Sequence, residues 1–223
     1  MRAREVLDQT MTPDGVPLEL AREGGHFVLR LASIPLMSSA AFGSEQAMAH
    51  IAFETLGPRA RARVLVGGLG MGYTLRAALD TFGARAEVTV AELLPAVVRY
   101  NRGVLGALAK HPLLDRRVSL HEGDVRTPLA AGGWDAVLMD IDNGPDAITT
   151  GDNATFYTDA GARLMARALT PGGVLIVWSA YPSASFERTL RRAGLRCETH
   201  RVPARSPKRK RGTHVLFVGQ RKR

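Results

Sequence analysis

The sequence predicts an α/β fold in which a doubly wound, mostly parallel sheet carries helices on both faces. From residue 63 onward, short apolar runs alternate with helical patterns, and this order is typical of parallel strands joined by crossover helices. Runs such as VLVG and AVLMD are apolar throughout, as expected for strands that helices cover on both sides. The last two runs are joined by PARSPKRKRG, which is too short for a crossover helix, so we expect them to form an antiparallel pair at one edge.

The first 57 residues are expected to form an extension before this sheet. Residues 16–37 read as two strands around Gly24-Gly25, a dipeptide that suits the positive φ angles of a tight hairpin turn. A helical pattern then starts at Ser44. The sequence therefore predicts a short N-terminal β-hairpin and a helix within residues 1–57, followed by one compact α/β unit at residues 58–223.

The elements of the main unit follow in order. Strands are expected in seven apolar segments: RVLVGG, EVTVAE, RVSLHEGD, WDAVLMD, GGVLIVWSA, LRCETHRV and THVLFVGQ. Helices are expected between them, starting at about Thr74 and spanning roughly Pro95 to Leu108, Ala160 to Leu169 and Ser185 to Ala193.

Composition excludes several classes of protein. With 45 % hydrophobic and 23 % charged residues, the chain has the balance of a globular protein with a core and is not disordered. No apolar run reaches the roughly 18 to 20 residues that span a membrane, and the N-terminus lacks the apolar stretch of a secretion signal, so we expect a cytoplasmic protein without a membrane partner. Cys197 is the single cysteine and the histidines show no ligand spacing, so no disulfide and no metal site are expected.

The positive charge of the chain is concentrated at its C-terminal end. Residues 186–223 contain 13 lysines and arginines against two acids, whereas the segment between Arg126 and Arg163 contains neither basic type. The basic run 208–211 leaves nucleic acid open as a partner, but no aromatic residues are interleaved with it, so a solvated basic loop is favoured. The sequence also leaves a homodimer open.

Glycines mark the loop after the first strand of the main unit. Gly68, Gly70 and Gly72 lie between an apolar strand and a helix, where the missing β-carbons let the backbone approach a ligand beside the helix N-terminus. The dinucleotide fingerprint requires a further glycine where Tyr73 stands, which argues against a dinucleotide. The loop predicts a nucleotide-like ligand, and a tight strand-to-helix turn without a ligand is the alternative.

Acidic residues end the next two strands. Glu92 lies 20 residues beyond Gly72, at a position that suits an acceptor for both hydroxyls of a ribose, although a solvated strand-end carboxylate would look the same. Asp124 follows the third strand at the same edge of the sheet. Its carboxylate suits the amino group of an adenine, or it caps a turn or helix.

Polar and aromatic residues follow the fourth and fifth strands. Asp140, Asp142 and Asn143 close the fourth strand, where carboxylates would bind a cationic substrate or hold a proton acceptor beside a nucleophile. Loop acids paired with backbone amides are the alternative. Trp178 and Tyr181 follow the fifth strand and would either stack on a substrate or border the core.

In this order, the segments resemble the spermidine synthase family, whose aminopropyltransferase domain is a variant of the Rossmann-like fold of class I AdoMet-dependent methyltransferases. VLVGGLGMGYTLR looks like the GGGDGGTLRE loop of that family, VTVAELLPAVV like its strand ending in the ribose-binding acid, and WDAVLMDIDNGP like the segment bearing its DSxDP motif. The resemblance covers roughly residues 18–180. It implies that Glu92 binds ribose, that Asp124 binds adenine and that Asp140 takes the place of the catalytic aspartate.

The sequence departs from this family at positions that contact the amine. The loop aspartate of the family falls on Met71 and the second aspartate of DSxDP falls on Asn143, so two negative charges are missing. The tyrosine of its YHE-type segment falls on Ser44, and the glutamine after the fifth strand is Trp178. Decarboxylated AdoMet lacks a carboxylate, so a loop acid suits it and repels intact AdoMet. Met71 removes that repulsion.

We therefore expect an AdoMet-dependent transferase that moves a methyl group to a small-molecule amine or hydroxyl. Asp140 and Asp142 would orient or deprotonate the acceptor, with Asn143, Trp178 and Tyr181 around it. Aminopropyl transfer from decarboxylated AdoMet is the alternative, favoured by these acids and the basic-free segment around them. A non-catalytic nucleic-acid-binding protein with the same fold is a third interpretation, favoured by the basic C-terminal end.

Overall fold

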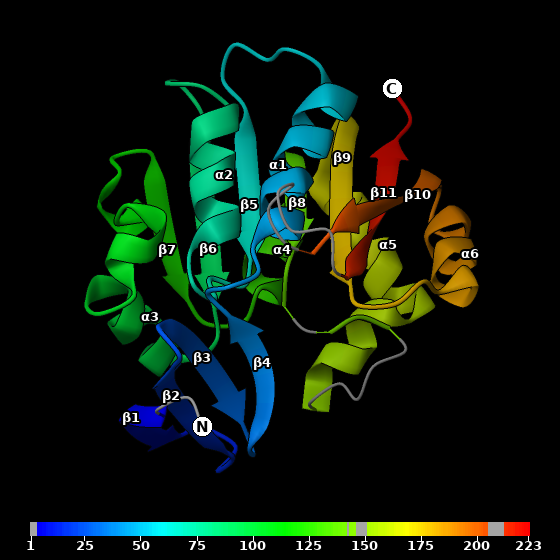
Figure 1. Cartoon of the computed structure of the whole chain (residues 1–223). Helices are drawn as coiled ribbons and strands as arrows, with labels where there is room; N and C mark the ends of the chain where they lie inside the picture. Colours follow the sequence, from blue (N-terminus) through cyan, green and yellow to red (C-terminus); the bar gives the residue numbers. More distant parts are fainter. Residues whose placement is uncertain (1–3, 142, 146–150, 205–211) are drawn as a thin grey trace.

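The computed structural model describes residues 4–141, 143–145, 151–204 and 212–223. Its strands form a seven-stranded sheet in the order β10-β11-β9-β8-β5-β6-β7 and a four-stranded sheet in the order β1-β2-β3-β4. Figure 1 shows the small N-terminal sheet lying beyond one end of the large sheet. The large sheet, with helices on both faces, is the doubly wound architecture that the sequence predicts.

Five neighbouring strands of the large sheet run parallel, and the antiparallel pair predicted for the C-terminal end is confirmed. The chain builds one half of the sheet outward from its centre and then returns to build the other half, so the order of the strands reverses between β5 and β8. The parallel strands are β5 (Arg63–Gly67), β6 (Glu87–Glu92), β7 (Val118–Glu122), β8 (Trp134–Met139) and β9 (Leu169–Ser179), and the antiparallel strands are β11 (Thr213–Arg221), next to β9, and β10 (Leu195–Pro203), at the edge.

The helices cover the two faces of the large sheet and enclose two apolar cores. One face carries α1 (Gly43–Leu56), α2 (Tyr73–Thr81) and α3 (Pro95–Arg102), and the other carries α4 (Arg126–Ala131), α5 (Asp159–Ala168) and α6 (Ala184–Arg192). Three short 3-10 segments complete the set: η1 (Gly106–Ala109), η2 (Pro112–Leu114) and η3 (Gly151–Tyr157).

The third helix is shorter than the sequence pattern predicts. It ends at Arg102 because Gly103 adopts φ −114° and ψ −117°, which lies outside the helical region. Of the apolar residues that continue the pattern to Leu108, Val104 and Leu105 lie in the turn after the helix, and Ala107 and Leu108 belong to the 3-10 segment η1. The short helix α4 was not predicted, because six residues carry too little periodicity to be recognised.

The predicted N-terminal hairpin is confirmed as part of a larger sheet. Strands β2 (Pro17–Glu23) and β3 (His26–Leu31) pair around Gly24-Gly25, and β1 (Arg4–Met11) and β4 (Ile34–Ser38) extend the hairpin on its two sides. The turn into β4 is invisible in the sequence, since Ala32 and Ser33 adopt φ values of 46° and 70° without being glycines.

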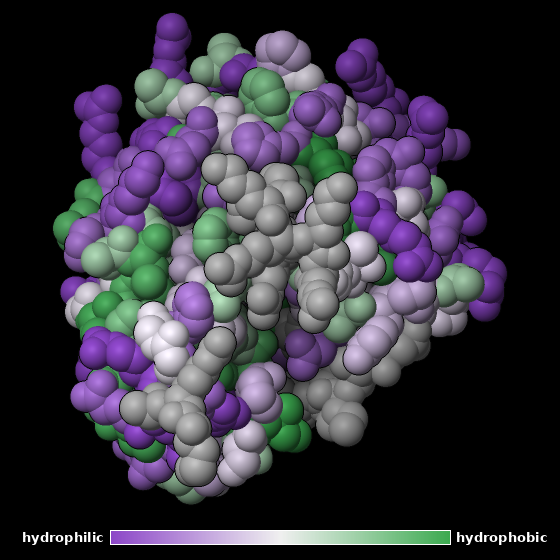
Figure 2. Space-filling view, in the orientation of Figure 1, coloured by the Kyte–Doolittle hydropathy of each residue, from purple (hydrophilic) through white to green (hydrophobic). Residues whose placement is uncertain are grey.

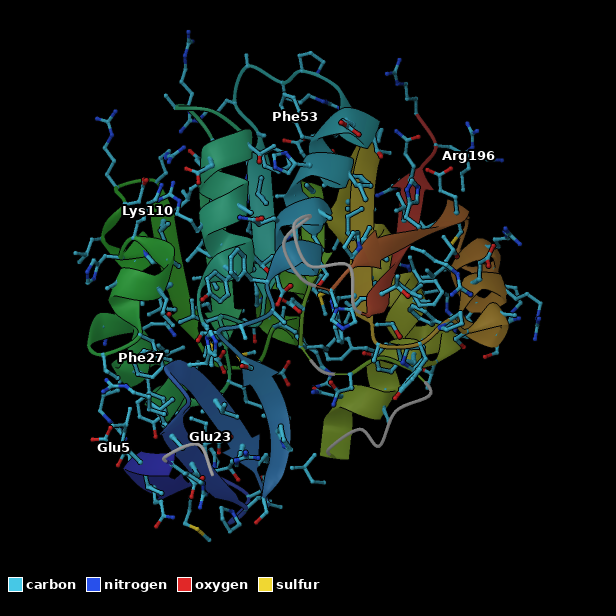
Figure 3. The ribbon with its side chains drawn as sticks, viewed as in Figure 1. Glu5, Glu23, Phe27, Phe53, Lys110 and Arg196 are labelled. Atoms are coloured by element: carbon cyan, nitrogen blue, oxygen red, sulfur yellow. The ribbon has the colours of Figure 1, made fainter. Side chains whose placement is uncertain are left out.

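The small sheet shares a core with the large one. Leu18, Leu20, Leu29 and Leu31 are buried in the same cluster as the residues of β5 and α2. The boundary after residue 57 therefore separates parts of one packed body, and a division into two structural units stays a prediction. Helix α1 starts beside β4 and runs away from the small sheet, so that Phe53 lies at its far end (Figure 3).

The surface fits the charge distribution of the sequence. In Figure 2 hydrophilic side chains cover the side of the molecule formed by α6 and β10, which carry five of the C-terminal arginines. The basic run 208–211 lies outside the described residues. Within the described ranges, no helix is both long and apolar enough to cross a membrane.

Candidate functional site

The point where the strand order reverses brings the glycine loop against the end of β8. Gly68 has φ +88°, and a β-carbon on it would lie 2.1 Å from the carbonyl oxygen of Asp140. The backbone N–H of Asp140 also donates to the Gly67 carbonyl at 2.8 Å. Only glycine permits this approach, so the loop and Asp140 are fixed relative to each other at the position where open α/β sheets bind ligands.

Glu92 is a buried carboxylate that holds the glycine loop. Its side chain ends β6, is 8 % exposed and accepts the N–H of Leu69 at 2.9 Å through Oε2 and the N–H of Leu94 at 2.8 Å through Oε1. Burial raises the pKa of Glu92, and the N–H donors of Leu94 and Leu69 oppose that rise. A carboxylate has about four acceptor positions, and the backbone N–H groups of Gly70 and Leu93 also act on this one, so a ligand hydroxyl would share its oxygens with the loop. The solvated strand-end alternative is wrong, because Glu92 is buried.

Asn101 on α3 fixes the same loop from the opposite side. Its Nδ2 donates to the carbonyls of Gly70 at 2.7 Å and Val97 at 3.0 Å, and the side chain is 2 % exposed. The other end of the loop is Gly72, with φ +81°, where α2 begins. The loop is thus held by Glu92 and Asn101 in a defined shape before any ligand arrives.

A pocket lies between the glycine loop and the start of α1. It is lined by Met37 and Glu45 on one side, by the loop residues 69–71 on the other, and by Asp140 from the end of β8. The Thr74 hydroxyl donates to Asp140 Oδ2 at 2.6 Å, which orients the carboxylate. Two carboxylates from distant parts of the sequence therefore face one pocket.

The environment of Glu45 makes it a proton acceptor near neutral pH. Burial raises the pKa of Glu45 to about 7, and the negative charge of Asp140 adds to the rise. The Ser44 hydroxyl donates to Glu45 Oε2 at 2.6 Å and partly opposes it. Glu45 can therefore gain or lose a proton under physiological conditions.

Neutral residues complete the pocket. Met71 lines it and is 3 % exposed, so an apolar side chain occupies the position where the resemblance places a loop aspartate. Tyr73 stacks on Phe42 with ring centroids 4.6 Å apart. Burial, together with the charge of Glu45, raises the pKa of Tyr73 to about 12, so its phenol stays protonated at neutral pH.

Those of the remaining predicted residues that the structure describes lie outside the lining of this pocket. The Asp124 carboxylate accepts the backbone N–H of Arg126 at 2.8 Å and pairs with its guanidinium at 2.5 Å, which fits the turn-cap alternative. Asn143 accepts the Ala180 N–H at 3.1 Å through its backbone, and the Tyr181 side chain is 61 % exposed. Asp142 lies outside the described residues.

Trp178 packs behind the pocket. Its ring meets the His214 ring edge to face with centroids 4.6 Å apart. Since it does not line the pocket, the structure gives it a place against the core, which was the alternative to stacking on a substrate.

Sequence reasoning missed three residues of the site: Glu45, Thr74 and His214. Thr74 belongs to the TLR part of the glycine loop, so the resemblance could have pointed to it. Glu45 stands directly after Ser44, at the middle position of the YHE-type motif, where the resemblance does not predict an acid. His214 lies on the last strand, and nothing in its local sequence indicates that it reaches Ser44.

Comparisons with known proteins identify the fold. No family model and no curated protein sequence matches the chain. Among solved structures, the spermidine synthase from Thermotoga maritima is similar, with a TM-score of 0.78 and 17 % identity over 97 % of this chain and 72 % of that one. A spermidine synthase in complex with the transition-state analogue AdoDATO has a TM-score of 0.77 and 17 % identity over the same shares.

At this identity the comparison shows a shared fold. The resemblance found in the glycine loop and the strand-end acids is therefore confirmed at the level of architecture: the chain has the spermidine synthase variant of the Rossmann-like fold.

Proposed function

We propose that this protein is a transferase that moves a group from a sulfonium nucleoside to a cationic or amine-bearing small molecule. The observation that carries the proposal is the pair Glu45 and Asp140, which line one pocket beside the glycine loop. Two carboxylates at the ligand-binding edge of the sheet create a negative potential that attracts an amine. A methyl or aminopropyl donor of the AdoMet type carries a positive sulfonium and is favoured by the same potential.

The glycine loop and Glu92 supply the donor site in this proposal. Gly68 and Gly70 let the loop pack closely against Asp140 and Met37, and the preformed carboxylate of Glu92 would share its oxygens between the loop and the ribose hydroxyls. The rigid loop means that binding does not have to order these groups first. Asp124 is proposed as an adenine contact only through its exposed oxygens, since Arg126 occupies part of its carboxylate.

The residues of the pocket then position the acceptor. The donor supplies a carbon made electrophilic by its sulfonium. The Thr74 hydroxyl holds Asp140 in place. Asp140 accepts a hydrogen bond from the acceptor amine and so directs the lone pair of the amine nitrogen towards that carbon. Glu45 lies in the same pocket with a pKa near neutrality, so it accepts the proton that the amine loses. Catalysis in this proposal is positioning combined with proton removal.

Aminopropyl transfer from decarboxylated AdoMet is the leading form of this reaction. The acidic pair favours an amine acceptor, and the solved structures with a similar fold include spermidine synthases. This reverses the order of the two transfers that the sequence favoured.

Methyl transfer from AdoMet is the second candidate, and Met71 favours it. A buried, neutral side chain at the loop position does not repel the carboxylate of intact AdoMet, as an aspartate there would. A small-molecule acceptor is common to both candidates. A homodimer, nucleic-acid binding and a cytoplasmic location stay predictions.

Product analysis decides between the two candidates. The purified protein is incubated with either donor and with a panel of diamines, monoamines and hydroxyl acceptors, and products are separated by mass. An aminopropylated amine formed only from the decarboxylated donor supports the leading form, and a methylated product supports the second. If neither donor binds in calorimetry or reacts, the transferase proposal is wrong. The double variant Glu45→Gln with Asp140→Asn is the matched control, because it removes both charges and keeps the shape of the pocket.

A further inference from the structure

A continuous line of hydrogen bonds leads from the pocket to the last strand. The Ser44 hydroxyl lies 2.6 Å from Glu45 Oε2 and 2.8 Å from His214 Nδ1. Ser44 is completely buried, while Glu45 and His214 are half-buried. Residues from α1 and β11, 170 positions apart in the sequence, thus meet at a single hydroxyl. A buried hydroxyl that is hydrogen-bonded to both a carboxylate and an imidazole can pass a proton between them.

The groups around this line leave few competing partners. On the pocket side, Asp140 and the Tyr73 phenol are the charged or titratable groups that act on Glu45 or feel its charge. On the far side, the Trp178 ring packs edge to face against His214. Burial lowers the pKa of His214, and among the described residues no charged group contributes to that shift. Ser44 is therefore the polar link between the two titratable groups.

We propose that Glu45, Ser44 and His214 form a proton relay that carries a proton out of the pocket. The relay rests on the proposed function, because transfer from a sulfonium to an amine releases such a proton. The carbon–sulfur bond breaks, its electron pair stays on sulfur to give a neutral thioether, and the amine nitrogen bonds to the carbon. The nitrogen then sheds one proton, which Glu45 accepts.

The hydrogen bonds permit two states that differ by this proton. When Glu45 is a carboxylate, Ser44 donates to it and His214 Nδ1–H donates to Ser44. When Glu45 is protonated, it donates to Ser44, and Ser44 donates to an unprotonated Nδ1. Passing one proton along the line returns Glu45 to the carboxylate and converts His214 from the neutral Nε2–H form to an imidazolium. The partly exposed ring then releases its Nε2 proton to solvent, and a change of tautomer back to Nε2–H resets the line. No oxidant or other reactant is needed.

The acidities of the two ends suit this transfer. Burial and Asp140 raise the pKa of Glu45 to about 7, so it takes up a proton readily. Burial lowers the pKa of His214 from 6.5, so its imidazolium gives the proton up. Transfer from Glu45 to His214 is therefore uphill, and loss of the proton from the imidazolium drives the relay forward.

A titration of the free protein tests the relay without any substrate. The ring nitrogens of His214 are followed by NMR from pH 5 to 9 in labelled protein, with the His214→Asn spectrum identifying the signal. We expect the Nδ1 shift to change in a second step at the midpoint of the Glu45 carboxyl. This step should disappear in Ser44→Ala and in Glu45→Gln. His200, which contacts Glu198 at an exposed site, is an internal control and should titrate alike in all variants.

Two outcomes would overturn the relay. An Nδ1 profile that is the same in the parent and in both variants shows that His214 does not sense Glu45. If Ser44→Ala fails to fold, Glu45→Gln decides alone, since its amide oxygen still accepts from Ser44. Because no donor or acceptor is present, the result stands even if product analysis rejects the transferase.

A kinetic test uses a variant that keeps a hydrogen bond between position 214 and Ser44. In His214→Asn, the introduced amide would still donate an N–H towards Ser44, but it cannot take up the proton. We expect kcat to fall by roughly 100-fold with KM unchanged, the lower end of the range for acid–base groups. Full kcat across the pH profile would show that His214 only supports the fold.

Discussion

At the scale of single residues, we assign two roles to Glu92: it holds the glycine loop, and its charge binds the ribose. The substitution Glu92→Gln separates the two roles. Both oxygens hold backbone N–H groups of the loop, and the charge is what a ribose would recognise. Glu92→Gln keeps the size of the side chain and removes the charge. We expect it to weaken binding of the sulfonium nucleoside by roughly 1.5 to 3 kcal/mol, the value of a hydrogen bond to a charged group. Calorimetry with the donor and with its thioether product measures the loss.

The matched control for this variant lies on the same strand. Glu87 begins β6 at the opposite edge of the sheet and pairs with Arg61 at the surface. Glu87→Gln should leave the affinity unchanged. Equal affinities of the parent and Glu92→Gln would show that Glu92 holds the loop and does not contact the nucleoside.

Met71 is the residue that we expect to set which donor the pocket prefers. If the neutral side chain matters, intact AdoMet binds the parent at least as well as decarboxylated AdoMet does, and Met71→Asp reverses that order. At about 4 Å and an effective dielectric near 20, one added charge changes carboxylate binding by up to roughly 4 kcal/mol. Competition binding with both donors measures which of the two binds more tightly to each variant.

The polar control for this reversal is Met71→Asn, which has nearly the same size as the aspartate but no charge. It should not reverse the order of the two donors. A parent that already prefers the decarboxylated donor would refute the role given to Met71 and leave aminopropyl transfer as the better candidate.

Glu45 should make stability depend on pH. Its pKa is raised from 4.5 to about 7 in the folded chain, so the folded state binds more protons than the unfolded state between these values. Stability is therefore unaffected by this group below about pH 4.5, falls as pH rises towards 7 and stays lower above it. The loss is at most about 3 kcal/mol. Glu45→Gln should remove it, so that the variant is more stable than the parent at pH 8.

Urea unfolding at several pH values measures this effect. Glu54→Gln, an exposed position on the same helix, is the control and should follow the parent. If the free energy of unfolding depends on pH in the same way for the parent and for Glu45→Gln, the pKa of Glu45 is not raised in the folded state.

At the scale of elements, α3 contributes to the donor site through one buried amide. Asn101→Ala removes the donors to the Gly70 and Val97 carbonyls and leaves both acceptors without this partner. We expect a loss of about 1 to 3 kcal/mol in the free energy of unfolding and weaker donor binding, because the loop is no longer fixed. Arg102→Ala, the next position on α3, loses only a surface ion pair and should cost less than about 1 kcal/mol. Equal costs would contradict the role of Asn101.

The elements that the sequence predicts well are those with a strong local signal. The parallel strands are continuous apolar runs, and the glycine loop and Glu92 stand at fixed places relative to them. The strands β1 and β4 were missed because β1 is largely exposed and β4 follows a turn without glycine. Tertiary packing, which local periodicity does not report, decides whether such segments pair.

The candidate site was predictable where its residues end strands and was not predictable where they meet from distant elements. Glu92 and Asp140 follow buried strands, so their common edge could be inferred. Glu45 and His214 are brought there by the path of α1 and by the antiparallel return of β11, and their contact through Ser44 exists only in three dimensions.

At the scale of the whole molecule, the N-terminal sheet and the large sheet meet over the donor loop. Gly70 has φ +51°, and a β-carbon on it would lie 2.5 Å from the Met37 methyl group, at the end of β4. Gly70→Ala therefore carries two costs: the positive φ, about 1 kcal/mol, and the displacement of Met37. Gly15→Ala has the same kind of backbone, with φ +76° and open space around it, so it should carry the first cost alone.

A double-mutant cycle isolates the contact between the two sheets. Met37→Ala empties the space that the new methyl group needs, so Gly70→Ala should be less costly in that background than in the parent. We expect a coupling of roughly 0.5 to 1 kcal/mol in the free energy of unfolding and a partial recovery of donor binding. Met37→Ala combined with Gly15→Ala should be additive, since no atom lies within 4 Å of the β-carbon there. Additive costs for Gly70 as well would show that the flexible end of the Met37 side chain moves aside, so that this contact does not couple the two sheets.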